Sequence, residues 1–177
     1  MQSLVSGIPR WAARLAVLVI VLGLAGCSQT LNMDGTKTAV TSGLTEKLGL
    51  TIASITCPEN RQAAAGDTFE CKVVPDSGGE LVVKVTQKDD QGNISWELTN
   101  TTNLIQLGLL AEHITKGMKE QMGMDAAVDC GGKYRVAVAG KTFECTATMA
   151  LGRQARVTVT MKDDQGQVSW DVKAPTP

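Results

Sequence analysis

One block of residues occurs twice in this chain, and the second copy follows the first at a constant distance. The cysteine of the block is Cys71 in the first copy and Cys145 in the second, and its tryptophan is Trp96 and then Trp170. Both pairs are 74 positions apart (145 less 71, and 170 less 96). Each copy reads Gly-x-Thr-Phe-Glu-Cys, then Lys-Asp-Asp-Gln-Gly, then Ser-Trp. A constant offset across glycine, cysteine, aromatic and turn residues indicates that one supersecondary unit was duplicated.

The first 26 residues are predicted to be a signal peptide of the lipoprotein type. Arg10 and Arg14 give a positive start without an acid, and the apolar run over residues 15–24 is shorter than the roughly 20 residues of a membrane-spanning helix. The run ends in Leu-Ala-Gly before Cys27, which resembles the lipobox of bacterial lipoproteins. This resemblance predicts that Cys27 is acylated, with palmitate as the expected lipid. The alternatives are an ordinary signal peptide or an uncleaved anchor that contains a cysteine.

A lipid on Cys27 would place the protein on the extracytoplasmic face of the cell membrane. The formal charge is −1 and aromatic residues make up 3% of the chain, so neither a basic footprint for nucleic acid nor a stacking platform is expected. Removal of the signal peptide deletes two arginines and no acid, which leaves the mature chain mildly acidic. Attraction to anionic lipid headgroups by charge is therefore not expected either.

The four cysteines that remain after Cys27 fall two to each copy of the block. Extracytoplasmic proteins keep disulfides, and although three pairings are formally open, the duplication favours Cys57–Cys71 and Cys130–Cys145. Each bridge would close a loop of about 15 residues, worth roughly 3 kcal/mol. A zinc site is the rival interpretation, but one histidine and no Cys-x-x-Cys make it a poor one. No metal and no cofactor is expected.

Apolar residues four positions apart predict a helix at the start of each copy. Gly49 and Gly123 follow the last apolar position and suit a left-handed C-terminal cap. Gly43 and Gly117 lie inside the helices, where glycine costs about 1 kcal/mol relative to alanine, so a close approach of helix to sheet is expected. The second helix is predicted to begin earlier, at Leu104, because the apolar run extends that far. The helical positions are Val40, Leu44, Leu48, Ile114, Met118 and Met122.

Alternating apolar residues predict four strands after each helix, with one face covered and the other wet. The fold class predicted is therefore α+β, a tandem duplication in which each unit is one helix packed on a four-stranded antiparallel meander sheet. The first-copy strands are expected at residues 51–57, 68–74, 80–88 and 93–98. The predicted divisions are a signal peptide at 1–26, a tether at 27–36, a first α+β repeat at 37–98 and a second at 104–172.

Several acidic positions and the histidine favour structural over catalytic interpretations. Asp89 and Asp163 open Asp-Asp-Gln-Gly segments between strands, which is the chemistry of a tight hairpin turn more than that of a calcium loop with six to eight oxygens. Glu70 and Glu144 lie on the wet face of separate units, too far apart for acid–base work. His113 has no counterpart in the first copy and no second histidine, so a Ser-His or Cys-His pair has little support. No enzyme is predicted.

Apart from the turns at 75–80 and 149–154, the loops at 58–65 and 131–139 are where the copies differ most, and loops on a rigid scaffold often carry recognition. Each loop keeps one arginine, Arg61 and Arg135, and the second loop adds Tyr134 beside it. These three residues are the candidate binding residues. The alternative is that both loops are spacers closed by their disulfides.

The chain resembles a small domain family of unknown function. Cys57-Pro58, then Gly66-Asp67-x-Phe-x-Cys, a valine-rich strand, a turn and a final strand carry the resemblance over residues 51–98, and residues 126–172 repeat it with Gly131 in place of the proline. The family is found in exported lipoproteins and membrane-anchored proteins of actinobacteria. It implies two disulfide-bearing α+β domains in the envelope, and it supplies no catalytic residues. A looser likeness, in architecture only, is to secreted β-lactamase-inhibitor proteins.

The expected function is that of a membrane-anchored cell-envelope lipoprotein, acting as a non-enzymatic binding or structural module. Its expected partners are the membrane, through the lipid, and an envelope protein, with no nucleic acid. The alternative is an inhibitor or regulator of an extracytoplasmic hydrolase that grips the enzyme in a groove between the two sheets.

Overall fold

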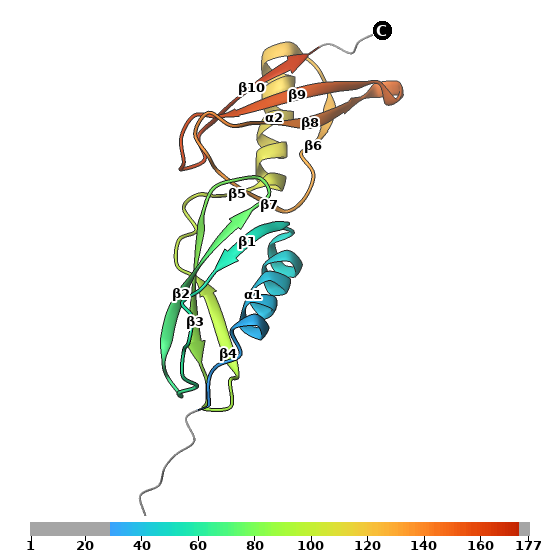
Figure 1. The fold of residues 1–177 in the computed structure, drawn as a ribbon. Helices are drawn as coiled ribbons and strands as arrows, with labels where there is room; N and C mark the ends of the chain where they lie inside the picture. Colours follow the sequence, from blue (N-terminus) through green and yellow to red (C-terminus); the bar gives the residue numbers. More distant parts are fainter. Residues whose placement is uncertain (1–28, 174–177) are drawn as a thin grey trace, which may run out of the picture.

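The computed structural model describes residues 29–173, and Figure 1 shows them as two units stacked end to end. The protein is α+β, with two helices and antiparallel sheets among these residues. Unit 1 is defined here as residues 29–98 and unit 2 as residues 103–173. In chain order the elements are α1 (Met33–Leu48), β1 (Ile52–Thr56), β2 (Thr68–Pro75), β3 (Leu81–Gln87), β4 (Ile94–Leu98), β5 (Leu104–Gln106), α2 (Leu107–Met122), β6 (Ala126–Asp129), β7 (Tyr134–Val136), β8 (Thr142–Met149), a 3₁₀ turn (Ala150–Gly152), β9 (Gln154–Met161) and β10 (Val168–Lys173).

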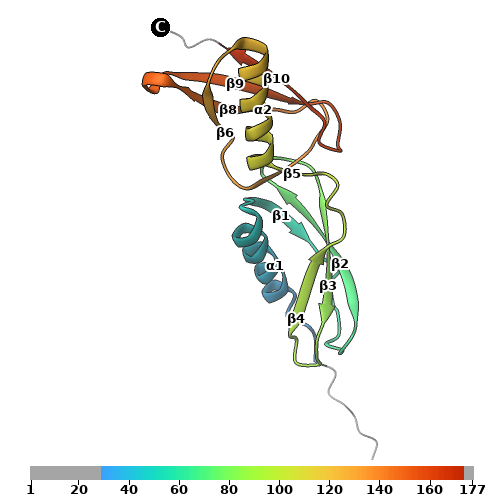
Figure 2. The same ribbon diagram turned by 180° about the vertical axis from the view of Figure 1, so that it is seen from behind.

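Each unit has a four-stranded antiparallel sheet with its helix on one face, as the two opposite views show (Figures 1 and 2). The strand order is β1-β2-β3-β4 in unit 1 and β6-β8-β9-β10 in unit 2. A third sheet of two strands joins β5 to β7. The inward faces of the strands alternate as the sequence pattern requires, so that Cys71 and Val73 of β2 are fully buried against Val40 and Leu44 of α1.

The two helices start at equivalent residues, 74 positions apart, and each has 16 residues. Gly49 and Gly123 end them in the left-handed conformation, with φ of 67° at both. The prediction that the second helix begins at Leu104 is wrong, because Leu104 starts strand β5 and the helix begins at Leu107. The apolar run at Leu104 serves contact with unit 1 instead of extending the helix face.

The residues expected to be a tether are partly folded. Thr30 forms a β-bridge with Gln62, Leu31 is buried in the core of unit 1, and α1 begins at Met33. The fold therefore reaches back to residue 29, and the tether at 27–36 is wrong from there on. Leu31 lies directly before the helix N-cap, Asn32, and its burial fixes this segment to the core although its neighbours are exposed. The signal peptide and Cys27 lie outside the described residues.

Each helix contains a glycine because a tryptophan of the sheet packs directly against it. A Cβ atom at Gly43 would lie 2.4 Å from Cζ2 of Trp96, and one at Gly117 would lie 2.6 Å from Cζ2 of Trp170. Carbon atoms in contact are normally 3.5 to 4.0 Å apart, so a side chain at either position would force the helix away from the sheet. The close approach expected from sequence is confirmed in both units.

The two units pack together through the β5–β7 pair, called the ribbon below. Leu104, Tyr134 and Val136 turn to one side and pack against the core of unit 1, and Val136 is 1% exposed. Ile105 and Ala137 pack against the core of unit 2. The ribbon is thus a wall shared by two hydrophobic cores.

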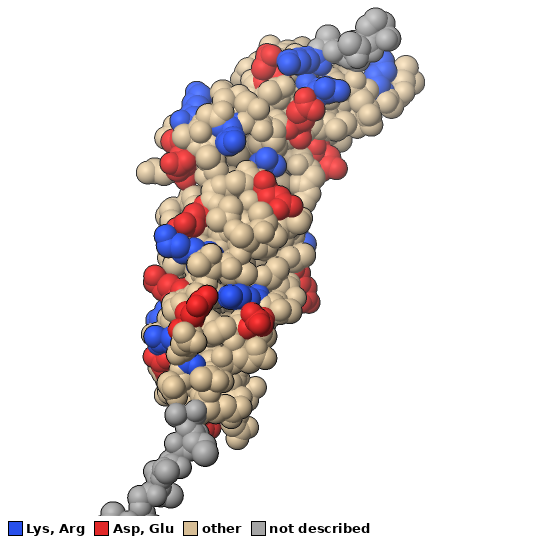
Figure 3. Space-filling model, viewed as in Figure 1, with Lys and Arg blue, Asp and Glu red and all other residues tan. Residues whose placement is uncertain are grey.

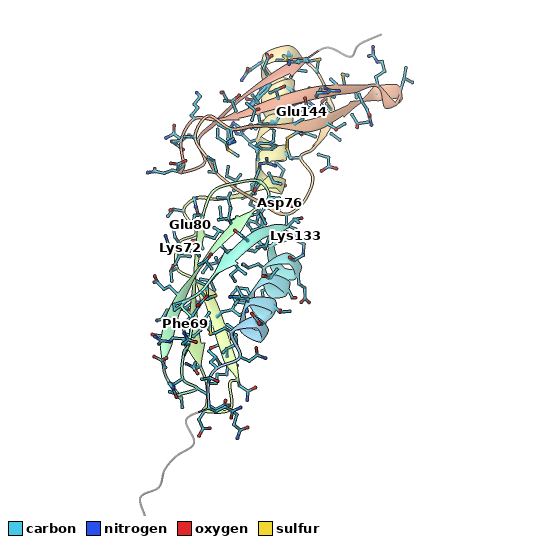
Figure 4. All side chains as sticks on the ribbon, in the orientation of Figure 1. Phe69, Lys72, Asp76, Glu80, Lys133 and Glu144 are labelled. Atoms are coloured by element: carbon cyan, nitrogen blue, oxygen red, sulfur yellow. A yellow bond between two sulfur atoms is a disulfide. The ribbon has the colours of Figure 1, made fainter. Side chains whose placement is uncertain are left out.

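The end of unit 1 that meets this wall is the β2–β3 hairpin. Gly79 in its turn has φ of 80°, and a Cβ there would lie 2.5 Å from Cγ1 of Val136. Asn103 donates a hydrogen bond to the Glu80 carbonyl at 3.1 Å, and Lys133 donates to the Glu46 carbonyl at 3.4 Å. Asp76 of unit 1 and Lys133 of unit 2, both labelled in Figure 4, lie close to this junction.

Candidate functional site

One hollow occurs in both units and therefore belongs to the duplicated scaffold. In unit 1 it lies between the start of α1 and the β3–β4 turn, with a volume of about 450 Å³ and with Thr36 and Gly92 in its lining. In unit 2 it has about 500 Å³ and is lined at the equivalent positions by Leu110 and Gly166. His113 is exposed and lines this second hollow.

A larger hollow of about 720 Å³ lies between α2 and β6 and is called the groove below. Small and apolar side chains line it, among them Gly108 and Ala111 of the helix and Ala126, Ala127 and Val128 of the strand. Small residues on both walls leave this space unfilled. Apolar concavities of this size are the usual form of a ligand site.

The same positions of unit 1 carry larger side chains. Asp34 stands where unit 2 has Gly108, Lys37 where it has Ala111, and Ile52 where it has Ala126. The groove therefore depends on residues in which the two copies differ.

Charged residues of both signs form the rim of the groove. Lys119 pairs with Asp125 at 2.8 Å, and this hydrogen bond with the carboxylate raises the pKa of Lys119. Glu112, Lys116 and Asp129 complete the rim. Over the face seen in Figure 3, acidic and basic side chains alternate, so no region of one charge sign dominates it.

One side of the groove is the free edge of β6. Within residues 29–173, β6 is hydrogen-bonded to β8 alone and ends the strand order of its sheet. Edge strands present unpaired N–H and C=O groups that an extended polypeptide can pair with. The groove thus combines an apolar floor with a row of backbone hydrogen-bonding groups.

The candidate residues Arg61 and Arg135 occupy equivalent places in the two units. Each guanidinium lies over the ring of the phenylalanine in its own unit, 5.4 Å from the Phe69 centroid and 4.5 Å from the Phe143 centroid. Tyr134 lies in β7 and packs toward unit 1. The structure therefore separates Tyr134 from the neighbouring arginine, since the two side chains turn to opposite sides of the ribbon.

The surroundings of the two arginines differ. Arg61 pairs with Asp67, with 2.5 Å between Nη2 and Oδ2, and Gln87, which is fully buried, donates to the same carboxylate at 3.1 Å. In unit 2 these two neighbours are Lys141 and Met161. Burial lowers the pKa of Arg135.

The Asp-Asp-Gln-Gly segments are hairpin turns. Asp89 accepts backbone hydrogen bonds from Gln91 and Asn93, each at 3.0 Å, and Asp163 accepts from Gln165 and Gln167 at 2.9 and 3.0 Å. Within residues 29–173 no group of three or more His, Cys, Asp or Glu side chains is placed to hold a metal ion.

Glu70 and Glu144 lie in different units, on the exposed faces of β2 and β8. Glu144, labelled in Figure 4, pairs with Arg156 at 3.4 Å. The pairing of strands explains this contact, because Glu144 and Arg156 lie on neighbouring strands of one sheet. The two glutamates do not meet in one cleft.

The turn between β8 and β9 projects from the far end of unit 2. Leu151 at its apex is 98% exposed, with φ of 61°. The equivalent turn of unit 1 is covered by the ribbon, as described above. Unit 2 therefore ends in an uncovered apolar side chain.

Both disulfides join strands within one unit, Cys57 to Cys71 and Cys130 to Cys145. The first spans 14 positions and the second 15. The loop closed in unit 1 is thus one residue shorter, and a bulge in β1 adds one residue before Cys57 that β6 lacks, which restores the offset between the copies. Cys71, Cys145 and Cys57 are buried, and Cys130 is half-buried.

Two segments of the sequence match one family. The match is to a domain of unknown function, DUF4333, over residues 15–92 and again over residues 94–166. The chain belongs to the DUF4333 family. The first match ends at Gly92 and the second at Gly166, each the turn glycine of its copy, so β4 falls at the start of the second match and β10 lies beyond both. The expected membership of a two-copy family of unknown function is confirmed, whereas the lipoprotein setting and the actinobacterial source stay predictions.

No curated protein and no solved structure matches this DUF4333 chain. Neither described helix is long and apolar enough to cross a membrane.

Sequence reasoning missed the groove. The signal was the loss of bulk between the copies, at Gly108, Ala111 and Ala126, which is visible only when the two copies are compared position by position. Periodicity alone classifies these residues as helix surface or strand face, because small residues carry little apolar pattern.

Proposed function

We propose that this DUF4333 protein is a cell-envelope lipoprotein that acts as a non-enzymatic binding module, with the groove between α2 and β6 as its binding surface. The lipobox-like ending at Cys27 supports the anchor. The single observation that carries the binding role is the groove, which has an apolar floor, a charged rim and a free strand edge.

The proposed occupant is an extended segment of an envelope protein, added as a strand beside β6. Such a segment would pair its backbone with the free edge and place alternate side chains on the alanine floor. The mixed charges of Lys116, Lys119 and Asp125 on the rim would determine the register in which the segment binds, and would add less to its affinity.

Ala111→Lys tests the groove, because it introduces the residue that unit 1 has at the same position, Lys37. Envelope extracts are passed over the full chain, and we expect the wild type to retain a partner that Ala111→Lys loses at least tenfold. Lys37→Ala is the matched control and should retain the partner as the wild type does. Equal retention by Ala111→Lys and wild type, with both folded by circular dichroism, would contradict the proposed surface.

Cys27→Ala tests the anchor separately. Metabolic labelling with palmitate should mark the wild-type protein and leave the variant unlabelled. Label that persists on Cys27→Ala would remove the basis for a lipoprotein, while leaving the groove hypothesis open.

A second candidate is an inhibitor of an extracytoplasmic hydrolase. The β8–β9 turn favours it, because a projecting loop with one exposed apolar residue, Leu151, has the shape that can enter an enzyme cleft. A grip between the two sheets has less support, since Gly79 and Val136 pack closely at that junction. Retention of one dominant hydrolase by the wild type, and its loss with Leu151→Asp, would favour this candidate over the groove.

A further inference from the structure

Unit 1 contains an arginine whose partners are all internal. The Arg61 guanidinium binds the Asp67 carboxylate, donates to the Thr68 carbonyl at 3.3 Å and lies over the ring of Phe69. Gln87 donates to the same carboxylate oxygen, Oδ2 of Asp67, at 3.1 Å. The charge of this half-buried arginine is therefore neutralised within the unit.

The backbone around the equivalent arginine of unit 2 has the same course. Asp67 N–H donates to the Ala64 carbonyl at 3.1 Å, and Lys141 N–H donates to the Val138 carbonyl at 3.0 Å. The carbonyl of residue 67 accepts from Gln87 at 2.9 Å, and that of residue 141 accepts from Met161 at 2.9 Å. The side chain of Lys141 therefore starts from the place that Asp67 has in unit 1.

Arg135 keeps the stacking position but lacks these partners. It lies over the ring of Phe143 at 4.5 Å and is half-buried. Within residues 29–173 neither Arg135 nor Lys141 forms an ion pair. A guanidinium has five N–H donors and stays charged, and a partly desolvated charge without a counter-ion is unfavourable.

We propose that Arg135 and Lys141 form a binding site for a carboxylate group of a ligand, which takes the place that the Asp67 carboxylate has in unit 1. Unit 1 shows the geometry of such a site, since Arg61, the equivalent of Arg135, lies over Phe69 and binds the Asp67 carboxylate. The site lies at the start of β8. It is separate from the groove, because neither Arg135 nor Lys141 lines that hollow.

A carboxylate fits better than a doubly charged anion. Asp164 lies near the site, where its Oδ1 accepts a hydrogen bond from the Ala139 N–H at 2.8 Å. Two cations and one nearby acid leave about one net positive charge, which suits a single carboxylate. The carboxylate can belong to a small organic acid or to an aspartate or glutamate of a polypeptide.

The experiment follows the arginine Nε–H signals of the ¹⁵N-labelled full chain in a neutral detergent at constant ionic strength. Acetate, an acetylated and C-terminally amidated peptide with one aspartate, and inorganic phosphate are titrated in turn. We expect a saturable shift of Arg135 with a dissociation constant of about 10 mM or tighter, while Arg61 stays unchanged because Asp67 occupies its site. Binding of acetate identifies a small acid as sufficient, and binding of the peptide alone identifies a polypeptide source.

Two variants exchange the key residue between the units. Lys141→Asp should fill the site and weaken binding at Arg135 at least tenfold, while its amide spectrum stays that of a folded protein. Asp67→Lys should make Arg61 respond to the same ligands. Equal or unsaturable shifts at both arginines, unchanged binding in Lys141→Asp, or tighter binding of phosphate than of either carboxylate would each overturn the proposal.

Discussion

The segment around the Thr30–Gln62 bridge of unit 1, called the outer wall below, has the same backbone course as the ribbon of unit 2 but carries different side chains. Ala63 N–H donates to the Gln29 carbonyl at 2.6 Å in one, and Ala137 N–H donates to the Asn103 carbonyl at 2.7 Å in the other. The outward positions differ. Thr30 and Gln62 of unit 1 are exposed, whereas Leu104 and Val136 at the equivalent places in unit 2 pack against unit 1.

This difference shows how two copies of one unit can pack against each other without offering the same contact to a third copy. Unit 1 ends in a polar wall, as terminal members of repeat proteins usually do. At the other end, Arg153 of unit 2 stands where unit 1 has Gly79, the residue that lets the hairpin approach Val136. The apolar wall and the small turn residue occur only where the two units meet, so the contact forms within the chain and is not repeated at either end.

Removal of a disulfide is the change with the largest expected effect. The pair Cys57→Ser with Cys71→Ser should lower the free energy of unfolding by about 3 kcal/mol. We expect hydrogen exchange to rise more in unit 1 than in unit 2, because each bridge lies in its own core. Cys130→Ser with Cys145→Ser is the matched variant and should give the opposite pattern.

Peptide mapping without reductant checks the pairing itself. Fragments that contain Cys57 should be linked to those with Cys71, and fragments with Cys130 to those with Cys145. A fragment that joins Cys57 to Cys130 would contradict the comparison of two separately bridged units.

Val136→Gln gives unit 2 the outward residue of unit 1. The substitution places an amide against the core of unit 1, and we expect it to lower the free energy of unfolding by about 2 kcal/mol. Gln62→Val, the reverse change at the exposed wall, should alter stability little. Denaturant unfolding measures both, and equal effects would show that the ribbon does not couple the units.

Gln87→Met gives unit 1 the buried residue that unit 2 has at Met161. The amide of Gln87 accepts from the Ala64 N–H at 3.1 Å and donates to the Gln62 carbonyl at 3.0 Å, and both groups would lose their partner. Part of this cost is offset by burial of the methionine, so we expect a net loss of about 1 kcal/mol. Thermal unfolding measures the change, and a stabilised variant would refute the role of this network.

The smallest expected effect concerns the β3–β4 turn. Hydrogen bonds from Asn93, first from its side chain at 2.7 Å and then from its backbone, lower the pKa of Asp89. The turn therefore gains stability above the unfolded-state pKa and loses it as the pH falls through the lower folded-state value. Asn93→Gln, which copies Gln167 of unit 2, should raise the pKa of Asp89 in an NMR titration. An unchanged titration would show that the side-chain bond has no part in the shift.

Much of the scaffold could be predicted because it depends on short-range patterns. Strands in unit 1 follow from alternation, and the close approach of each helix to its sheet could be expected from the matching glycines Gly43 and Gly117, whereas the tryptophans that they meet could not. The start of the second helix could not be predicted. Leu104 continues an apolar run in sequence, and only the position of unit 1 shows that it lies on a strand facing another core.

The candidate site residues were likewise predictable from the sequence only in part. Arg61 and Arg135 could be found as the basic residues that the two loops share, but only the structure shows that Asp67 is the counter-ion of Arg61 and that Lys141 stands at the equivalent place in unit 2. The separation of Tyr134 from Arg135 depends on which side of the ribbon each faces. The groove required knowledge of which helix and strand lie side by side.

The sequence by itself determined the duplicated unit, its disulfide-bearing cysteines, its turns and its family, because these depend on residue identity and on spacing along the chain. The tertiary structure decided how the copies join, which arginine has an internal counter-ion and where a hollow is left open. Those features arise from contacts between segments far apart in sequence, where the loss of one bulky or charged side chain changes the packing of its neighbours without changing any local pattern.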